Sequence, residues 1–226
     1  MRISLDSVSV EWSGNAALNR VSLDLEQKCI AVIGANGSGK STFARLLNGL
    51  VKPTSGKVLV GGIDVQADPK TAQRQAGFIF SNPDLQIIMP TVIEDVEFSL
   101  KPLKLAAAET RTRALAALDQ FGISDLAERR AHELSSGQKQ LLALAAVSVT
   151  NPKLIIADEP TALLDLRNTQ QVAEALFGLA DQQVVLVTHD LSLAERCDVA
   201  VRFESGRLLE VGEPTDVIAR YCRDYL

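Results

Sequence analysis

The spacing of hydrophobic and polar residues changes several times along the chain. Residues 3–12 and 18–25 alternate apolar with polar side chains, as half-buried antiparallel strands do. Residues 29–34 instead form a continuous apolar run, which predicts a central strand covered on both faces. From Lys40 to Leu50 the spacing becomes helical. This part of the chain therefore predicts antiparallel strands beside a buried strand that leads into a helix.

The middle of the chain, residues 82–150, is predicted to be helical. Within it, Glu109 precedes Arg113 by four residues, the spacing of an ion pair on one face of a helix. Apolar runs typical of buried strands return at residues 153–158 and 183–190. The helical stretch therefore interrupts a sheet whose strands come from both ends of the chain.

A further helix is predicted over residues 166–180, between the last two of these strands. Such alternation of strand, helix and strand implies a parallel sheet with right-handed crossovers. Residues 200–214 then predict a hairpin, which a short final helix follows. The whole pattern predicts an α/β fold with a mixed sheet, an antiparallel β part and a helical insert.

Composition and charge narrow the function classes. The 226 residues are 46% hydrophobic and 23% charged, which is typical of a globular protein with a buried core. With 23 basic and 28 acidic side chains, a net charge of −5 and no basic run, the chain does not favour nucleic acid as a partner. Its start does not resemble a signal peptide, and its apolar stretches are shorter than the ~20 residues that cross a bilayer. We therefore expect any membrane role to be peripheral.

The three cysteines, Cys29, Cys197 and Cys222, are widely spaced and lie outside any CxxC pair. Their odd number and spacing indicate neither a disulfide framework nor a zinc site. A reducing cytosolic environment fits this pattern.

The strongest chemical signal is GANGSGKST, which follows the buried strand at residues 29–34 and opens the helix from Lys40. It satisfies GxxxxGK[ST], in which glycines let the backbone wrap phosphates while Lys40 reaches the outer phosphates and Ser41 ligates Mg²⁺. The alternative is an ordinary glycine-rich turn. The predicted phosphate-binding residues of this loop are Gly34, Asn36, Gly37, Ser38, Gly39, Lys40, Ser41 and Thr42.

Two adjacent carboxylates end the apolar strand LIIADEP. The carboxyl ends of strands are where α/β sheets bind ligands, so Asp158 is predicted near the Mg²⁺ and Glu159 facing the attacking water. A solvated acidic pair is the alternative. His189 ends another buried strand, where it either braces the γ-phosphate or the water or serves as a structural donor. For His132 we prefer the structural interpretation.

Two further features leave questions open. Trp12, the single tryptophan, is either a core residue or a platform for the adenine ring. LSSGQKQ, at residues 134–140, is typical of a helix N-cap with donors left for an anion. It lies almost a hundred residues beyond the only other obvious phosphate site, so the source of its anion is not evident from the segment alone.

In their order along the chain, GANGSGKST, LSSGQKQ, LIIADEP, ALLD and VTHD together resemble an ATP-binding cassette ATPase, over nearly the whole of residues 1–226. The resemblance implies one domain, with a core of residues 1–81 and 151–226 and a helical signature subdomain of residues 82–150. It favours the stacking role for Trp12. It also implies that two cassettes pair head to tail, so that each signature contacts the ATP held by its partner. The implied signature and interface residues are Ser135, Ser136, Gly137, Gln138 and Asp165.

The segment FSNPDLQIIMPTVIEDVEFSL is similar to a stretch of the energy-coupling-factor ATPases. This resemblance implies a second cassette subunit, identical or different, a membrane-embedded coupling protein and a separate membrane subunit that binds the substrate. It places the chain at the cytoplasmic face of a bacterial plasma membrane. As cargo it favours biotin among the vitamins, with cobalt or nickel as the alternative.

The sequence departs from the family pattern at three places. Ser81 stands where the family usually has Gln, and its shorter side chain puts strong ATPase activity or tight coupling in question. Ser136 replaces a glycine of the signature, and the chain ends at Leu226 without the C-terminal extension of many relatives. The alternatives to an importer ATPase are a cassette outside transport, such as one for iron–sulfur assembly, and a nucleotide clamp that hydrolyses ATP weakly.

Overall fold

The computed structural model describes residues 1–12 and 14–225. Contacts between Cα atoms divide the chain into two compact units. The first unit consists of Met1–Gly77, Lys153–Glu159 and Gln182–Leu226, and the second of Phe78–Pro152 and Pro160–Asp181. The predicted α/β fold with a mixed sheet, an antiparallel β part and a helical portion is confirmed.

The first unit holds a small antiparallel sheet with the strand order β2-β1-β4-β5. The predicted pairing of the first two strands is confirmed, with Leu5 opposite Leu23. The alternation along β1 slips by one position at Ser7, which has a φ of +50°, and resumes at Val8. Side chains on one face of β1 are therefore buried on both sides of this irregularity. The strands are β1 (Ile3–Trp12), β2 (Asn15–Leu25), β4 (Ser55–Val60) and β5 (Ile63–Asp64).

The larger sheet has the strand order β10-β9-β3-β8-β7-β6. β9, β3, β8 and β7 run parallel, and β10 is antiparallel to β9. Every residue of β7 and β8 is buried, as their continuous apolar sequences predict. The strands are β3 (Cys29–Ile33), β6 (Ala76–Ile79), β7 (Leu154–Asp158), β8 (Gln183–Val187), β9 (Val199–Glu204) and β10 (Arg207–Gly212).

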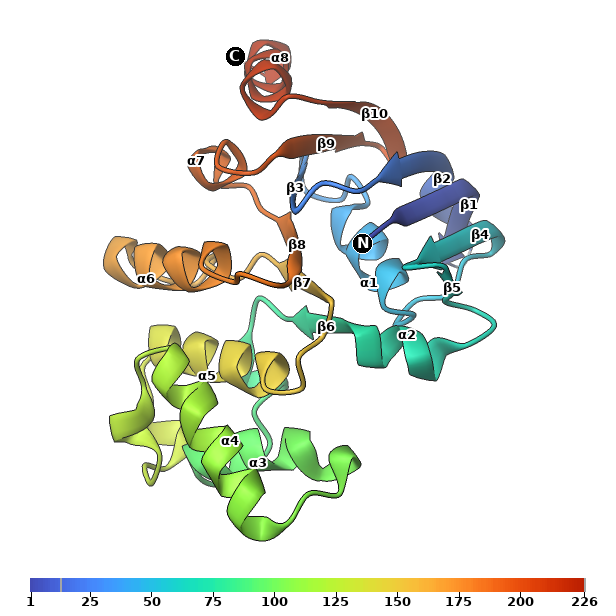
Figure 1. Ribbon diagram of the computed structural model, residues 1–226. Helices are drawn as coiled ribbons and strands as arrows, with labels where there is room; N and C mark the ends of the chain where they lie inside the picture. Colours follow the sequence, from blue (N-terminus) through green and yellow to red (C-terminus); the bar gives the residue numbers. More distant parts are fainter. Residues whose placement is uncertain (13, 226) are drawn as a thin grey trace. The chain divides into compact units, whose positions relative to one another are not determined.

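Helices α1, α7 and α8 of the first unit pack on strands of this sheet, and α2 contacts β5 of the small sheet (Figure 1). Helix α1 packs on β7 and β8 and brings Phe43 against Phe203, with 5.1 Å between the ring centroids. Helix α8, at the red end of the chain, packs on β9 and β10. The helices are α1 (Lys40–Leu47), α2 (Pro69–Gln75), α7 (Leu191–Ala194) and α8 (Pro214–Tyr225).

A buried guanidinium joins α8 to the sheet. Arg202, on β9, is only 1% exposed. It forms ion pairs with Glu210 on β10 and Asp224 on α8, and its guanidinium carbon lies 5.2 Å from the Tyr221 ring centroid. In the parallel pairing of β3 with β9, Arg202 lies opposite Ile33. Charge and packing together therefore fix the last helix on the edge of the sheet.

The second unit is mostly helical. Helix α3 packs against both α4 and α5, and α5 packs against α6. The predicted ion pair on α4 is confirmed, with 2.7 Å between Glu109 and Arg113. The predicted boundaries of the helical subdomain, residues 82 and 150, stay a prediction; the unit defined by contacts begins at Phe78 and includes α6. The helices are α3 (Val92–Leu100), α4 (Ala107–Gln120), α5 (Ser136–Ser148) and α6 (Leu166–Phe177), with short 3₁₀ turns η1 (Pro83–Leu85), η2 (Lys101–Leu103), η3 (Ser124–Leu126) and η4 (Ala131–Glu133).

Several predicted elements end earlier in the structure, for local reasons. The first helix ends at Leu47, and Gly49, at a φ of +74°, turns the chain away. Helix α6 ends at Phe177 rather than residue 180. Strand β8 ends at Val187 rather than residue 190, because the amide of His189 donates to a carboxylate instead of a neighbouring strand.

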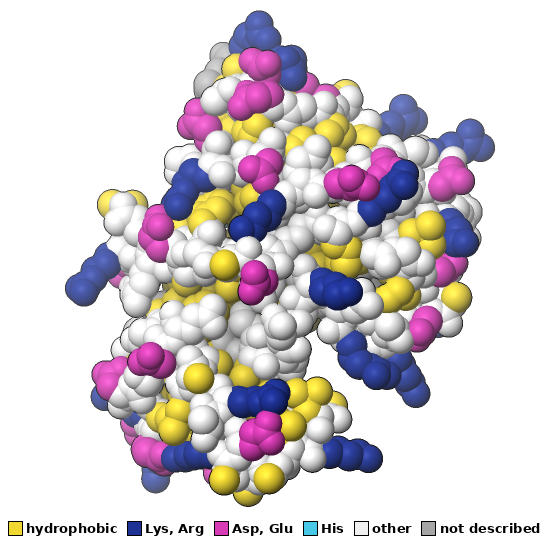
Figure 2. All heavy atoms as spheres, viewed as in Figure 1, with side chains coloured by type: hydrophobic (Ala, Val, Ile, Leu, Met, Phe, Trp, Pro, Cys, Tyr) yellow, Lys and Arg dark blue, Asp and Glu magenta, His cyan; other side chains and the backbone are white. Residues whose placement is uncertain are grey.

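The surface carries charges of both signs. On the face drawn in Figure 2, Lys and Arg side chains are interspersed with Asp and Glu side chains. Among the described residues, none of the helices combines the length and the apolar character needed to span a bilayer.

Candidate functional site

The loop between β3 and α1, residues 34–39, is built on close backbone packing. Gly34 has a φ of +145°, and a Cβ added there would lie 2.2 Å from the carbonyl oxygen of Phe203. Gly39 has a φ of +103°, and its Cβ would lie 2.7 Å from the carbonyl oxygen of Ala17. A side chain at either position would push the loop off the strands behind it. Gly34 and Gly39 of the predicted phosphate loop are therefore required by sterics as well as by the motif.

A hollow of about 250 Å³ lies above this loop. The hydroxyl of Ser38 is buried beside it and has no hydrogen-bond partner among the described residues. Helix α1 starts here with no side-chain cap and no acidic residue in its first turn. The positive end of the helix and the unpaired hydroxyl together form a site that fits phosphate oxygens. The hollow is lined by Ala17, Asn36, Gly37, Ser38, Gly39, Lys40, Ser41, Thr42 and Glu159.

Lys40 is the first residue of α1 and is only 7% exposed. Its Nζ donates to the carbonyl oxygens of Gly34 and Ala35, at 2.8 and 3.0 Å. Burial lowers the pKa of this ammonium, and the nearby carboxylates of Glu159 and Asp158 act in the opposite sense. The loop thus holds one cation, already largely removed from water, beside the space for a ligand.

Asp158, the last residue of β7, joins the acidic strand end to the loop. Its Oδ1 accepts a hydrogen bond of 2.8 Å from the Ser41 hydroxyl, and Arg45 lies 3.8 Å from its Oδ2. Burial raises the pKa of this carboxyl, while the bond from Ser41 and the charge of Arg45 oppose the shift. A hydroxyl and a carboxylate oxygen side by side are ligands that Mg²⁺ accepts, with waters and phosphate oxygens completing its coordination. The residues present therefore fit Mg²⁺.

Glu159 adopts a backbone conformation that is rare for a residue with a side chain. Its φ is +53°, and its amide donates to the carbonyl oxygen of Val187 at 2.9 Å. Its Oε2 lies 2.7 Å from Nδ1 of His189 and accepts a longer bond, 3.3 Å, from the amide of His189. Strain of this kind persists where the surroundings impose it, often at functional sites. The structure thus places His189 on the carboxylate that was predicted to face the attacking water.

Trp12 ends β1 opposite Asn15, and 54% of its surface is exposed. The alternative of a core tryptophan is therefore wrong. The adenine-stacking role stays a prediction, since Ala17 on β2, rather than Trp12, lines the hollow. Sequence reasoning missed Ala17, which carries no recognisable motif.

The signature segment lies in the second unit, at the N-terminus of α5. Ser135 and Gln138 cap each other there: the amide of Ser135 donates to the Gln138 side chain at 3.0 Å, and the amide of Gln138 to the Ser135 hydroxyl at 3.3 Å. A Cβ on Gly137 would lie 2.3 Å from Oδ1 of Asn168. Asp165, the N-cap of α6, accepts bonds of 2.8 and 2.9 Å from the amide and side chain of the same Asn168. Within this unit, Asn168 therefore links the signature to Asp165, and sequence reasoning missed it.

The stretch that resembles the energy-coupling-factor ATPases is also in the second unit. Asp95 is buried and accepts bonds of 2.9 and 3.0 Å from the amides of Ile88 and Met89. Burial raises the pKa of this carboxyl. Leu85 and Ile88 remain 74% and 62% exposed. They belong to a segment beside a hollow of about 260 Å³, which is lined by Asp84, Ile87, Ile88, Met89, Pro90, Ala131 and His132.

Two residues singled out in the sequence, Ser81 and His132, form no hydrogen bond or ion pair with the site residues among residues 1–12 and 14–225. Ser81 is exposed and follows β6. His132 is exposed at the rim of the second unit's hollow. The roles of both stay predictions.

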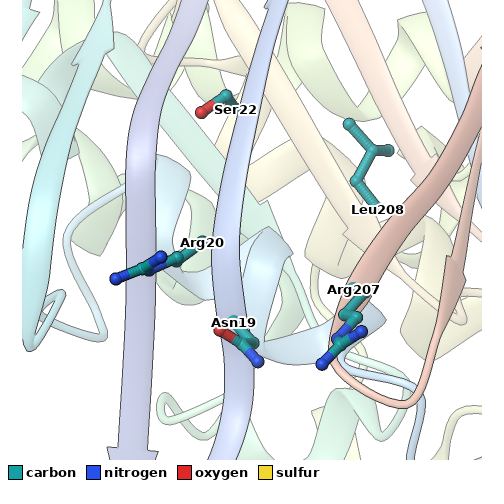
Figure 3. Close-up of a pocket in the computed structure, with 5 residues that line it drawn as sticks. All are labelled: Asn19, Arg20, Ser22, Arg207 and Leu208. Atoms are coloured by element: carbon teal, nitrogen blue, oxygen red, sulfur yellow. The ribbon is translucent and has the colours of Figure 1, made fainter.

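A larger hollow, of about 510 Å³, lies elsewhere in the first unit. Figure 3 shows its lining residues on β2 and β10, with the guanidinium of Arg207 near Asn19 and that of Arg20 directed toward the neighbouring strand. It contains no carboxylate, and none of its residues belongs to the sequence motifs. Its lining consists of Asn19, Arg20, Ser22, Arg207 and Leu208. Chemistry therefore favours the smaller hollow above residues 34–39 as the functional site.

Comparison with known proteins bears on these sites. A family model described as "ABC transporter" matches residues 18–162. The chain is 45% identical over 221 residues to the "Biotin transport ATP-binding protein BioM" of Rhizobium etli, covering 98% of each chain.

Two solved structures are similar as well. The cbiO1 protein of Clostridium perfringens, described as part of the ABC transporter complex cbiONQ, has a TM-score of 0.86 and 31% identity; the match covers 97% of this chain and 92% of that one. The ATP-binding cassette MJ0796, solved as a dimer in a post-hydrolysis state with ADP and Pi, has a TM-score of 0.82 and 27% identity, over 94% of this chain and 98% of that one.

Proposed function

The chain belongs to the ABC transporter family as an ATP-hydrolysing subunit, and from this premise we propose that it powers the uptake of biotin into a bacterial cell. The hydrogen bond between Ser41 and Asp158 carries the chemical part of the proposal, because it joins the phosphate loop to the acidic end of β7. The similarity to a biotin transport ATP-binding protein supports the choice of cargo.

In the proposed site, each residue around the loop has one task. The amides of residues 34–39 and the hydroxyl of Ser38 bind the phosphates of ATP, and Lys40 exchanges its loop carbonyls for phosphate oxygens. Ser41 and Asp158 would hold Mg²⁺, which neutralises charge on the phosphates when bound. Trp12 supports the adenine ring from the end of β1.

The proposed hydrolytic step depends on Glu159 and its contact with His189. Glu159 positions a water molecule for in-line attack on the γ-phosphate and accepts its proton. His189 holds the carboxylate through Nδ1 and, with the rest of its ring, braces the γ-phosphate. The strained backbone of Glu159 fixes the direction of the carboxylate before ATP arrives.

The signature segment is proposed to act on ATP bound by a second cassette. Ser135 and Ser136 are exposed, and the capping box orders the start of α5 without using an external ligand. Asp165 would lie at the same interface because Asn168 ties it to the signature. A closed pair of cassettes therefore needs ATP between them, and hydrolysis releases the pair. The second cassette is either a copy of this chain or a related subunit.

The hollow of the second unit is the proposed docking site for a membrane-embedded coupling protein. Leu85 and Ile88 present apolar surface at its side, and Asp95 fixes the backbone between them and α3. Exposed apolar side chains of this size favour a protein partner. The coupling protein would hold a separate membrane subunit that binds the substrate. This arrangement places the chain at the cytoplasmic face of the plasma membrane.

The ATP-dependent pairing is tested with Glu159→Gln. The amide keeps the size of the side chain but removes the base, so we expect turnover to fall by about 10²- to 10³-fold while ATP holds the protein as a dimer. Phosphate release and light scattering with Mg²⁺ and ATP measure the two effects. Glu195→Gln, on the exposed surface after α7, is the matched control. A variant that remains monomeric with ATP and retains full turnover would contradict the composite site.

The cargo is tested separately, in cells that express the chain with its membrane partners. Uptake of labelled biotin that is lost with Glu159→Gln would support the proposal. ATP-dependent uptake of nickel or cobalt without biotin would overturn the cargo and leave the ATPase mechanism standing.

A further inference from the structure

Two cysteines that are far apart in the sequence meet in the first unit. The sulfur of Cys29, the first residue of β3, lies 2.7 Å from the sulfur of Cys197, which is 168 positions away. Their spacing in the sequence indicated no disulfide, yet the fold brings the two free thiols into contact. The separation is still longer than the ~2.05 Å of a disulfide bond.

The backbone around the two thiols is already fixed. The amide of Cys29 donates to the Asp198 carboxylate at 2.8 Å, and the amide of Asp198 donates to the carbonyl oxygen of Cys29 at 2.9 Å. These two hydrogen bonds hold the start of β3 beside the residue that follows Cys197. The sulfurs therefore reach bonding distance by side-chain rotation, with little movement of the main chain.

The two thiols differ in their access to solvent. Cys29 is partly exposed, so a dissolved oxidant reaches it, whereas Cys197, which follows α7 in the chain, is buried. The hydrogen bond between the two sulfurs and burial both raise the pKa of the Cys197 thiol. Cys197 is thus kept as a thiol until its neighbour has reacted.

We propose that Cys29 and Cys197 are a peroxide-reactive dithiol site that closes to a reversible disulfide. In the first step the Cys29 thiolate attacks hydrogen peroxide; an S–O bond forms, the O–O bond breaks, and protonation of the leaving hydroxide gives water and the sulfenic acid of Cys29. In the second step the sulfur of Cys197 attacks that of Cys29. The S–O bond breaks, and the proton of Cys197 leaves with the hydroxyl as a second water. The two thiols lose two electrons, and the peroxide gains them.

The bond has a defined mechanical effect. The disulfide would join the amino end of β3 to the segment that follows α7 in the chain. The other end of β3 leads into the phosphate loop, and α7 begins shortly after His189. The disulfide also closes a long stretch of chain, which restricts the unfolded state and stabilises the folded one. Because a thiol reductant reverses the bond, the site responds to a change of redox state in the cytosol.

The experiment compares the full-length chain with variants at each cysteine after treatment with hydrogen peroxide. We expect reactive thiols to fall from three to one, a mass decrease of about 2 Da, and a rise in Tm of at least about 4 °C, all reversed by dithiothreitol. Cys222→Ser, on α8, is the matched control and should show the same rise in Tm and the same mass decrease.

Cys29→Ser and Cys197→Ser should each lose the mass decrease and the rise in Tm. Cys29 is partly exposed, so its variant decides the question even if the buried Cys197→Ser does not fold. Oxygen added at Cys29 or Cys197 of the wild-type chain in place of the cross-link, located by peptide mass mapping, would overturn the proposal. A retained cross-link in Cys29→Ser, or its loss in Cys222→Ser, would do the same.

Discussion

In the phosphate loop of the first unit, Ser38 and Lys40 are buried polar residues, whereas in the signature segment of the second unit the capping pair Ser135 and Gln138 is more exposed and its side chains are hydrogen-bonded. Ser38 and Lys40 are almost removed from solvent, and among the described residues the Ser38 hydroxyl finds no hydrogen bond. Ser135 and Gln138 instead complete each other's hydrogen bonds at the surface. Burying an unpaired hydroxyl costs free energy that a bound phosphate offsets.

This difference shows how ligand binding affects the stability of each region. The loop is preorganised for a ligand and is less stable without one, so binding ATP should stabilise the first unit. The signature is a well-capped helix start that gains nothing from a ligand of its own unit. Its proposed contact with ATP therefore depends on an outside molecule. Three substitutions test this contrast.

The largest effect is expected for Lys40→Ala, which tests the role of the phosphate loop. The variant loses the one buried cation of the hollow, so we expect kcat/KM for ATP to fall by at least about 100-fold and nucleotide binding to weaken. Phosphate release and nucleotide titration measure these changes. Lys52→Ala, at an exposed lysine, should behave like the wild type. Turnover near the wild-type rate in Lys40→Ala would show that the loop is not the site of hydrolysis.

A smaller effect is expected for Gly137→Ala, which tests the role of the signature segment. The new methyl group meets Asn168 at 2.3 Å, so α5 and α6 must shift. We expect ATP turnover to fall about tenfold and Tm to drop by a few degrees. Binding of nucleotide by the phosphate loop of a single chain should be unchanged. Gly137→Ala combined with Asn168→Ala should recover only part of the lost Tm, because the contacts with Oδ1 and Cγ disappear while the Cβ of residue 168, at 2.9 Å, remains. If the single variant instead weakens nucleotide binding, the two regions do not act separately.

The smallest effect is a change in stability for Asp158→Asn. Because burial raises the pKa of Asp158, the folded state binds its proton more tightly than the unfolded chain. The unfolding free energy therefore decreases as the pH rises through the folded-state pKa, and this loss is complete above it. The neutral amide avoids the loss, so we expect Tm without nucleotide to rise by about 2 °C at neutral pH.

The difference in Tm between the wild type and Asp158→Asn should shrink in acidic buffer, where the wild-type carboxyl is protonated. Differential scanning calorimetry at the two pH values measures it. A variant that is less stable than the wild type at neutral pH would mean that the bonds from Ser41 and Arg45 outweigh the cost of burial.

Local patterns predicted much of the fold, while the partners of the site residues came from contacts distant in sequence. The buried strands and the glycine loop were predictable because apolar runs and φ-specific glycines act over a few residues. Nothing near Gly137 indicates Asn168, and nothing near Asp158 indicates Arg45. The early end of β8 was also hidden, because it depends on the carboxylate of Glu159 capturing the amide of His189.

The guanidinium of Arg202 makes the far end of the chain matter to its beginning. Asp224 and Tyr221 come from the last helix, yet the cation they shield lies opposite Ile33, one residue before the phosphate loop. Removing that helix would take away Asp224 and Tyr221 and leave Glu210 on β10 to pair with the buried cation. A shortened protein should therefore be less stable beside the phosphate loop and lose ATPase activity, even though every motif is intact. Fusions or tags at this end of the protein should therefore leave helix α8 intact, because it supports the strand beside the phosphate loop.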